Sequence, residues 1–227
     1  VELEAAKQID YYFMKGKTMD AVVANYRMLT GNSPMMPLYL FGYIQSKERY
    51  VSSDDLINTL KEYRQRQIPI DMIVQDWNYW PEGQWGNMSM NPKFYPDKRK
   101  LADEIHSLHA KLMISIWPNA MNCPQHEEFK RKGWLLSGTS VYDAFNPLAR
   151  KLYWNYANNE FFGNGFDAWW CDASEPLDAD WTFMKDGYGA DNHRQRWELN
   201  TNLLNSVLGA ERSQLYSLYH AKGIYEN

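Results

Sequence analysis

The sequence predicts an α/β fold in which parallel strands alternate with helices. Short apolar runs without polar alternation recur along the chain, which is typical of strands covered on both faces. A helical segment follows each run, and this order builds parallel sheets with right-handed crossovers. The runs end at Gln45, Asp76, Trp117 and Asp172. Because functional residues gather at the carboxyl ends of parallel strands, these four positions are the first candidates for a site.

Residues 1–37 are expected to form a lead-in linker segment with one short strand and one helix. The apolar and aromatic residues 9–14 predict the strand. Thr18 then precedes a helical pattern of about three turns, which stops at Gly31. Threonine before a helix and glycine after it are common capping residues. The remaining residues, 38–227, are expected to form the main domain.

Four strands and their helices are expected in the main domain. The strands are expected at residues 38–44, 68–74, 111–116 and 166–171. The helices are expected at about residues 53–67, 97–110, 125–132, 148–161 and, with a break near Gly209, 192–225. Ser52 or Ser53 provides the N-cap of the first of these helices, and Pro96 and Asp97 start the second. The loops that follow the strands are long and rich in aromatic residues, as in barrel enzymes.

Four strand–helix units are half of a (β/α)8 barrel, which needs about 250 residues. We therefore expect a TIM-barrel type catalytic domain, truncated to about its first four units. An open, doubly wound four-stranded sheet is the structural alternative. A half barrel would expose two sheet edges and apolar surface. The remainder of the catalytic barrel, or self-association, is expected to cover them.

Composition narrows the function classes. With 24 Lys and Arg against 28 Asp and Glu, the chain offers no basic face for nucleic acid. It has no apolar run of 18 residues, so no membrane span is expected. The chain does not begin with Met, and localisation stays unknown: a periplasmic, extracellular or cytoplasmic place would each fit.

The cysteines and histidines do not predict a metal site. Cys123 and Cys171 lack metal-ligand spacing, and two free buried thiols are favoured over a disulfide. Among the five histidines only His106 and His109 are close in sequence, on one expected helix, and no third ligand is near them. We therefore expect no metal site.

The segment at residues 166–176 carries the strongest functional signal. An apolar, aromatic strand ends in Asp172, which small residues, Glu175 and a proline follow. An aspartate in this place can instead cap the next helix. We take Asp172 as the leading candidate for a catalytic residue. The 10 Trp and 16 Tyr of the chain suit either stacking on sugar rings or a large core.

The strand ends resemble those of glycoside hydrolase family 31, especially its α-xylosidase and α-glucosidase members. The likeness lies in residues 40–50 (LFGYIQSKERY), 73–80 (IVQDWNYW), 114–119 (ISIWPN) and 169–176 (WWCDASEP). Residues 84–88 (QWGNM) resemble the xylosidase branch in particular. The resemblance implies a (β/α)8 barrel that hydrolyses terminal α-linked xylose or glucose of oligosaccharides with retention of configuration. No cofactor is needed for this chemistry.

The resemblance also implies roles for single residues. Asp172 matches the family's nucleophile, Asp76 a residue that hydrogen-bonds the sugar hydroxyls, and Trp117 an aromatic lining of the same subsite. Further wall candidates are Trp77, Trp170 and Gln45, and Glu175 is expected to support the loop of the nucleophile. Core packing is the alternative for each tryptophan.

The family's acid/base aspartate has no match in this sequence, since its motif follows later strands of the barrel. Asp167, Asp178, Asp180 and Asp186 all lack the expected context. A non-catalytic carbohydrate-binding fragment is therefore the alternative function. An unrelated α/β enzyme would require four coincidental matches in the family's order.

Overall fold

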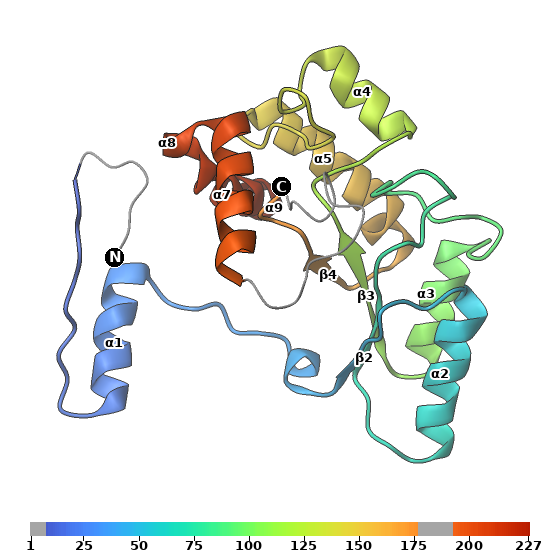
Figure 1. Cartoon of the computed structure of the whole chain (residues 1–227). Coiled ribbons are helices and arrows are strands. Elements are labelled where there is room, and N and C mark those ends of the chain that lie inside the picture. Colours follow the sequence, from blue (N-terminus) through green and yellow to red (C-terminus); the bar gives the residue numbers. More distant parts are fainter. Residues whose placement is uncertain (1–7, 177–192) are drawn as a thin grey trace.

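The computed structural model describes residues 8–176 and 193–227 (Figure 1). Its centre is a parallel sheet with the strand order β1-β2-β3-β4. The strands are β1 (Ile44–Gln45), β2 (Met72–Gln75), β3 (Lys111–Ile116) and β4 (Ala168–Cys171). Sequential parallel strands joined by helices are the architecture that the sequence predicted.

The helices between and after the strands lie close to their expected positions. They are α1 (Met19–Thr30), α2 (Ser53–Gln65), α3 (Lys98–Ser107), α4 (Pro124–Lys132), α5 (Pro147–Glu160), α7 (His193–Leu208), α8 (Ala210–Ser213) and α9 (Tyr216–Glu226), with short 3₁₀ turns η1 (Leu38–Phe41) and η2 (Phe162–Asn164). In Figure 1, α2 and α3 lie side by side against the sheet, while α1 stands apart from it. No helix in the described ranges is long and apolar enough to cross a membrane.

The N-caps predicted at Thr18 and Ser52 are confirmed, and Asp97 is the N-cap of α3. The side chains of Thr18, Ser52 and Asp97 accept hydrogen bonds from backbone N–H groups three residues later, at 3.2, 3.1 and 2.8 Å. Each bond satisfies a donor that the first helical turn leaves free. Local capping signals therefore fixed where α1, α2 and α3 begin.

One predicted strand at the start of the chain is wrong, and a second is much shorter than predicted. Residues 9–14 form no strand in the described part of the chain and are largely exposed, because no neighbouring strand pairs with them. Of residues 38–44, only Ile44 lies in the sheet, paired with Met72. Residues 38–41 form η1 instead, directly after Pro37, and Tyr39 and Leu40 pack on the sheet as a cover.

β2 and β4 begin later than predicted for a shared reason. The N–H of Ile68 donates to the Tyr63 carbonyl at 2.9 Å, and the N–H of Phe166 donates to the Phe161 carbonyl at 3.2 Å. These residues therefore close the end of the preceding helix and are not free to join the sheet ladder. An apolar run in the sequence predicts that a strand is present. It does not predict the residue at which that strand begins.

The two faces of the sheet differ in what covers them. Ile73, Leu112, Ile114 and Ile116 belong to the main core, together with residues of the helices. Met72, Val74 and Met113 form a separate cluster, which packs against Tyr39, Leu40, Ile44 and Ala168. We call this second side the inner face. The helices cover the outer face, which agrees with the barrel and not with the doubly wound alternative.

The cysteine and histidine expectations need correction. Cys123 and Cys171 are free, as expected, but Cys171 is exposed, because β4 is an edge strand of the described sheet. His106 and His109 do not share a helix face: α3 ends at Ser107, and His109 has a left-handed φ of 55°.

A polar cluster ties the amino-terminal ends of β3 and β4 together. Asp167 accepts hydrogen bonds from the Lys111 ammonium at 2.8 Å and from the Leu112 N–H at 2.9 Å. The His106 ring nitrogen Nε2 lies 2.7 Å from Oδ2 of this carboxylate, the oxygen that also accepts from the Leu112 N–H. Burial alone would raise the pKa of Asp167, but Lys111, Leu112 and His106 together lower it below the ordinary value.

We expect Asp167→Ala to lower the free energy of unfolding by about 3 kcal/mol at pH 7, since it leaves Lys111 and the Leu112 N–H without their acceptor. Because the folded pKa is depressed, the stabilisation is present above the unfolded pKa of about 3.9 and is lost as pH falls through the folded pKa. Urea unfolding at pH 7 and pH 3 measures both effects. Equal stability of variant and parent at pH 7 would contradict this role.

Candidate active site

Strand alternation brings four of the predicted residues to one end of the inner face. Side chains two residues apart in a strand share a face. Asp76 therefore follows Val74 beyond the end of β2, and Trp117 follows Ser115 beyond β3. On β4, Trp170 pairs with Ser115, and Asp172 comes next on the same side. Asp76, Trp117, Trp170 and Asp172 thus converge at the carboxyl ends of three adjacent strands.

Asp172 is held by the backbone around it. Its N–H donates to the Ile116 carbonyl at 3.0 Å, which extends the β3–β4 ladder by one residue. Its side-chain Oδ1 accepts from the Ala173 N–H at 2.8 Å. Ala173 is buried with φ of 55°, a left-handed conformation that costs energy for any residue with a Cβ. This turn ends the strand and fixes the carboxylate of Asp172 at the mouth of the sheet.

Asp76 lies half-buried across β3 from Asp172. Burial is the main reason why its pKa is raised above the ordinary value, and the negative charges of Asp172 and Glu48 raise it further. The Trp77 N–H, which donates to Oδ1 at 2.8 Å, and the Ser115 hydroxyl oppose this rise. The two carboxylates therefore sense each other's charge at the same end of the sheet.

Ser115 is a residue of this site that the sequence reasoning missed. It is fully buried in β3, its hydroxyl accepts from the Trp117 indole N–H at 3.0 Å, and its carbonyl accepts from the Tyr79 hydroxyl at 2.8 Å. Its spacing could have revealed it, because Ser115 is the one polar residue between Leu112 and Trp117 and lies two residues before Trp117.

We expect Ser115→Ala to raise the pKa of Asp76 further, since it removes a donor that favours the charged carboxylate. It should also cost about 1 kcal/mol of stability through the lost hydrogen bond to Trp117. Carbon-13 NMR titration of the aspartate carboxyl groups measures the pKa. An unchanged or lower pKa of Asp76 would contradict this account of its environment.

Aromatic rings form one wall beside the two aspartates. Trp85 is at its centre, with its ring centroid 5.4 Å from that of Trp117, 5.6 Å from Trp80 and 5.7 Å from Trp77. Trp117 is only 7% exposed, so it presents a small part of its surface. The wall therefore serves the core and the site at once.

Gly86 brings this wall to the end of β3. It has φ of 65°, and a Cβ there would lie 1.9 Å from the Asn119 carbonyl oxygen. The adjacent Trp85 carbonyl accepts from the Met121 N–H at 2.8 Å. Only glycine permits this close approach, which sets Trp85 against Trp117.

The other predicted residues lie differently. Gln45 is on the outer side of β1, where its side-chain oxygen accepts from the hydroxyls of Tyr43 and Tyr63, so it does not reach the two aspartates. Glu175 is exposed beyond the Asp172 turn, while Trp170 belongs to the inner face and is 46% exposed there. Asp178, Asp180 and Asp186 lie outside the described residues. Among the described residues, no group of three or more His, Cys, Asp and Glu could hold a metal ion.

Comparison with protein families identifies the relatives of this chain. A model of the glycosyl hydrolases family 31 TIM-barrel domain matches residues 33–227, which is most of the sequence. The chain belongs to glycoside hydrolase family 31. The resemblance of its four strand ends to this family is therefore confirmed.

Among curated proteins of the family, the chain is 41% identical over 177 residues to an alpha-xylosidase of Saccharolobus solfataricus. This match covers 78% of the chain and 24% of the relative. The chain is 25% identical over 187 residues to an alpha-glucosidase of the same organism, covering 75% of the chain and 26% of the relative.

Solved structures agree with this assignment. The family-31 alpha-xylosidase of Xanthomonas citri matches with a TM-score of 0.67 and 32% identity, covering 87% of the chain and 24% of that structure. A family-31 dextranase of Flavobacterium johnsoniae, at 21% identity and a TM-score of 0.74, shares the fold and covers 93% of the chain and 26% of that structure. The family-31 chain described here thus spans about a quarter of the length of these relatives.

Proposed function

We propose that this chain carries the nucleophile half of a retaining α-glycosidase that removes terminal α-linked xylose from oligosaccharides. The observation that carries the proposal is the placement of Asp172 directly after β4, with Asp76 and Trp117 at the same end of the inner face. Family membership supports glycoside hydrolysis as the chemistry.

In this proposal an oxygen of the Asp172 carboxylate attacks the anomeric carbon. The bond to the leaving oxygen breaks, and that oxygen takes a proton from a second carboxylic acid. Water then hydrolyses the glycosyl ester and restores Asp172. The resemblance to the family assigns the second acid to a segment after later strands. The backbone hydrogen bond from Ala173 to Oδ1 leaves Oδ2 as the attacking oxygen.

Asp76 is proposed to bind the sugar hydroxyls. An ionised carboxylate accepts hydrogen bonds from hydroxyl groups, and charge-assisted bonds are stronger than neutral ones. Its position at the same end of the inner face, across β3 from Asp172, supports contact with a sugar ring whose anomeric carbon faces the nucleophile. Trp117, Trp77 and Trp170 supply aromatic surface around that ring. Glu175 is proposed to act on the loop and not on the sugar.

Xylose is favoured over glucose by the comparisons. The identity to the alpha-xylosidase of S. solfataricus is 41%, against 25% to the alpha-glucosidase of that organism. Xylose lacks the hydroxymethyl group of glucose, so the two substrates differ in the room needed beyond the ring. A pocket that fits xylose closely would reject glucose by steric clash.

The test uses a chimera, because the chain spans about a quarter of its relatives. This chain replaces the matching segment of the S. solfataricus alpha-xylosidase, and hydrolysis of 4-nitrophenyl α-xyloside and α-glucoside is followed by proton NMR. We expect faster release of xylose, with the α-anomer formed first. The β-anomer first would contradict a nucleophilic Asp172. A folded chimera that binds sugar without cleaving it would favour the non-catalytic carbohydrate-binding alternative.

A further inference from the structure

The loop that follows Asp172 is bound by a helix much later in the chain. The hydroxyl of Ser217, in the first turn of α9, donates to the Ser174 carbonyl at 2.9 Å. Within the described ranges, the other hydrogen bonds of residues 173–176 stay within the loop, Asp172 and β4. We call residues 173–176 the Asp172 loop.

The direction of the Ser217 hydroxyl is unusual for a serine inside a helix. Such a serine commonly donates to a carbonyl in the preceding turn of its own helix. Ser206 on α7 does so, with its hydroxyl 2.8 Å from the Leu203 carbonyl. Ser217 instead donates to a residue outside α9. The contact with the Asp172 loop therefore depends on where α9 is held.

Buried hydrogen bonds hold α9 on both sides of Ser217. Tyr216, which is fully buried, donates its hydroxyl to the Tyr142 carbonyl at 2.9 Å. His220 is also buried, and its Nδ1 lies 2.7 Å from the Tyr142 hydroxyl. Both groups lack water as an alternative partner, so these contacts fix the first turns of α9.

The second half of α9 is held against α5. A Cβ at Gly223 would lie 2.7 Å from Cδ of Arg150, so only glycine permits the approach of the two helices. Arg150 is buried and donates to the Ala144 carbonyl at 2.9 Å and to the Glu226 carboxylate at 3.2 Å. Because α9 is fixed near both of its ends, the Ser217 hydroxyl is a rigid support for the Asp172 loop.

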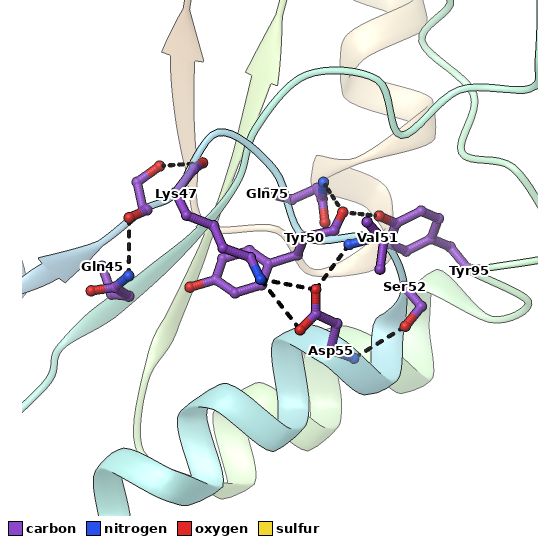
Figure 2. Close-up of polar contacts among 9 residues, drawn as sticks. Gln45, Lys47, Tyr50, Val51, Ser52, Asp55, Gln75 and Tyr95 are labelled. Carbon is purple, nitrogen blue, oxygen red and sulfur yellow. Dashed lines mark hydrogen bonds and ion pairs between the residues drawn. The ribbon is translucent and has the colours of Figure 1, made fainter.

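The loop after β1 is held by a similar device (Figure 2). There the Asp55 carboxylate on α2 accepts from the Val51 N–H at 3.1 Å and from the Lys47 ammonium at 3.1 Å. In both places a helix side chain binds a loop at the carboxyl end of a strand. Asp55 lies only four residues from Val51, whereas Ser217 lies 43 residues from Ser174. The Ser217 contact therefore forms only once α9 has docked.

The Asp172 loop contains a strained turn that needs such support. Ala173 has φ of 55°, and its N–H donates to Oδ1 of Asp172 at 2.8 Å. A residue with a Cβ keeps this conformation only where surrounding contacts impose it. Ser217 binds the residue directly after Ala173. Loss of that contact would free the turn to relax and to move its N–H away from the carboxylate.

We infer that Ser217 is a positioning residue for Asp172, because it holds the Ser174 carbonyl and thereby keeps the Ala173 turn and the attacking carboxylate in place. The inference rests on the proposed function for the role of Asp172. Ser217 acts through the loop and takes no part in bond making or breaking. Its hydroxyl therefore sets the rate of attack and not the affinity for the sugar.

The rate at which 5-fluoro-α-xylosyl fluoride labels Asp172 in the chimera tests this inference. We expect Ser217→Ala to lower the limiting rate about fivefold, the effect of one neutral hydrogen bond, and to leave the reagent concentration at half that rate unchanged. Ser217→Thr keeps a hydroxyl at an exposed position and should restore the parent rate. Ser206→Ala, which removes an exposed hydroxyl bonded within its own helix, is the matched control and should label at the parent rate.

Hydrogen exchange of the whole 227-residue chain provides a readout that needs no activity. We expect the backbone amides of residues 172–175 to exchange faster in Ser217→Ala than in the parent. Ser217→Thr and Ser206→Ala should exchange like the parent at these residues. Exchange in α5 should stay unchanged in all three variants, since the contacts that hold α9 are intact.

The outcomes separate this inference from the proposed function. Labelling of Asp172 at the parent rate in Ser217→Ala overturns the inference and leaves the proposed function standing, even where exchange in the loop is faster. Slower labelling that Ser217→Thr does not restore, or that comes without faster exchange, also overturns it. A folded, active parent chimera that is not labelled on Asp172 overturns the proposed function, and the positioning role falls with it.

Discussion

Asp172→Asn in the chimera is expected to lower kcat for 4-nitrophenyl α-xyloside by about 10⁴-fold. The amide keeps the size of the carboxylate and can still accept the hydrogen bond from the Ala173 N–H. It cannot form the glycosyl ester, so the two-step route is lost. A factor of this size corresponds to roughly 5 kcal/mol of transition-state stabilisation.

Asp97→Asn is the matched control for that variant. Asp97 caps α3, which packs against the outer face of the sheet, and asparagine caps a helix about as well as aspartate. Steady-state kinetics of both variants should show a normal rate for Asp97→Asn. If Asp172→Asn kept more than about a tenth of the parent rate, this residue would not be the nucleophile.

Asp76→Asn is expected to lower kcat/KM by about 10²–10³-fold, because it weakens charge-assisted hydrogen bonds to the sugar. Such bonds are worth about 1.5–3 kcal/mol each. It should also change the pH profile. Burial and the charge of Asp172 raise the pKa of Asp76, so its ionised fraction falls as pH drops through a value above the ordinary one of about 3.9. Activity should fall over the same range.

Glu48→Gln is expected to shift the pKa of Asp76 in the opposite direction to Ser115→Ala. The charge of Glu48 raises the pKa of Asp76, so its removal should lower that pKa and move the acidic limb of kcat/KM to lower pH. Asp76→Asn should remove the contribution of Asp76 to the limb and make the limb insensitive to the charge of Glu48. Profiles of kcat/KM from pH 3 to 8 compare the two variants with the parent. A limb that stays in place in Asp76→Asn would belong to another group.

An element of the fold was predictable where residues close to it in sequence decide its conformation. β3 has the predicted bounds, because a run of apolar residues lies between the end of α3 and Pro118. The caps of α2 and α3 are single side chains three residues from their donors. In contrast, η1 and residues 9–14 have strand-like composition, and only the absence of a pairing neighbour in the described sheet decides their conformation.

The residues of the candidate site were also predictable only where neighbouring residues in the sequence decide their position. Strand ends predicted Asp76 and Asp172, since parallel strands bring their carboxyl ends together. Gln45 also ends a strand, but its side chain points to the outer face, where Tyr63 of α2 binds it. Counting residues along β1 required the true strand bounds, which the sequence did not supply. Ser115 and the contact of Trp85 with Trp117 depend on distant loops meeting across Gly86.

Covalent trapping with 5-fluoro-α-xylosyl fluoride tests the central claim most directly. The activated fluoride leaves with little help from an acid, so the reaction isolates the nucleophile. Both the chimera and the 227-residue chain are treated, and intact mass and peptide mapping locate the label. The account predicts a single fluoropentosyl adduct on Asp172 that Asp172→Asn abolishes. A folded, catalytically active chimera labelled on another carboxylate, or not labelled at all, would contradict it.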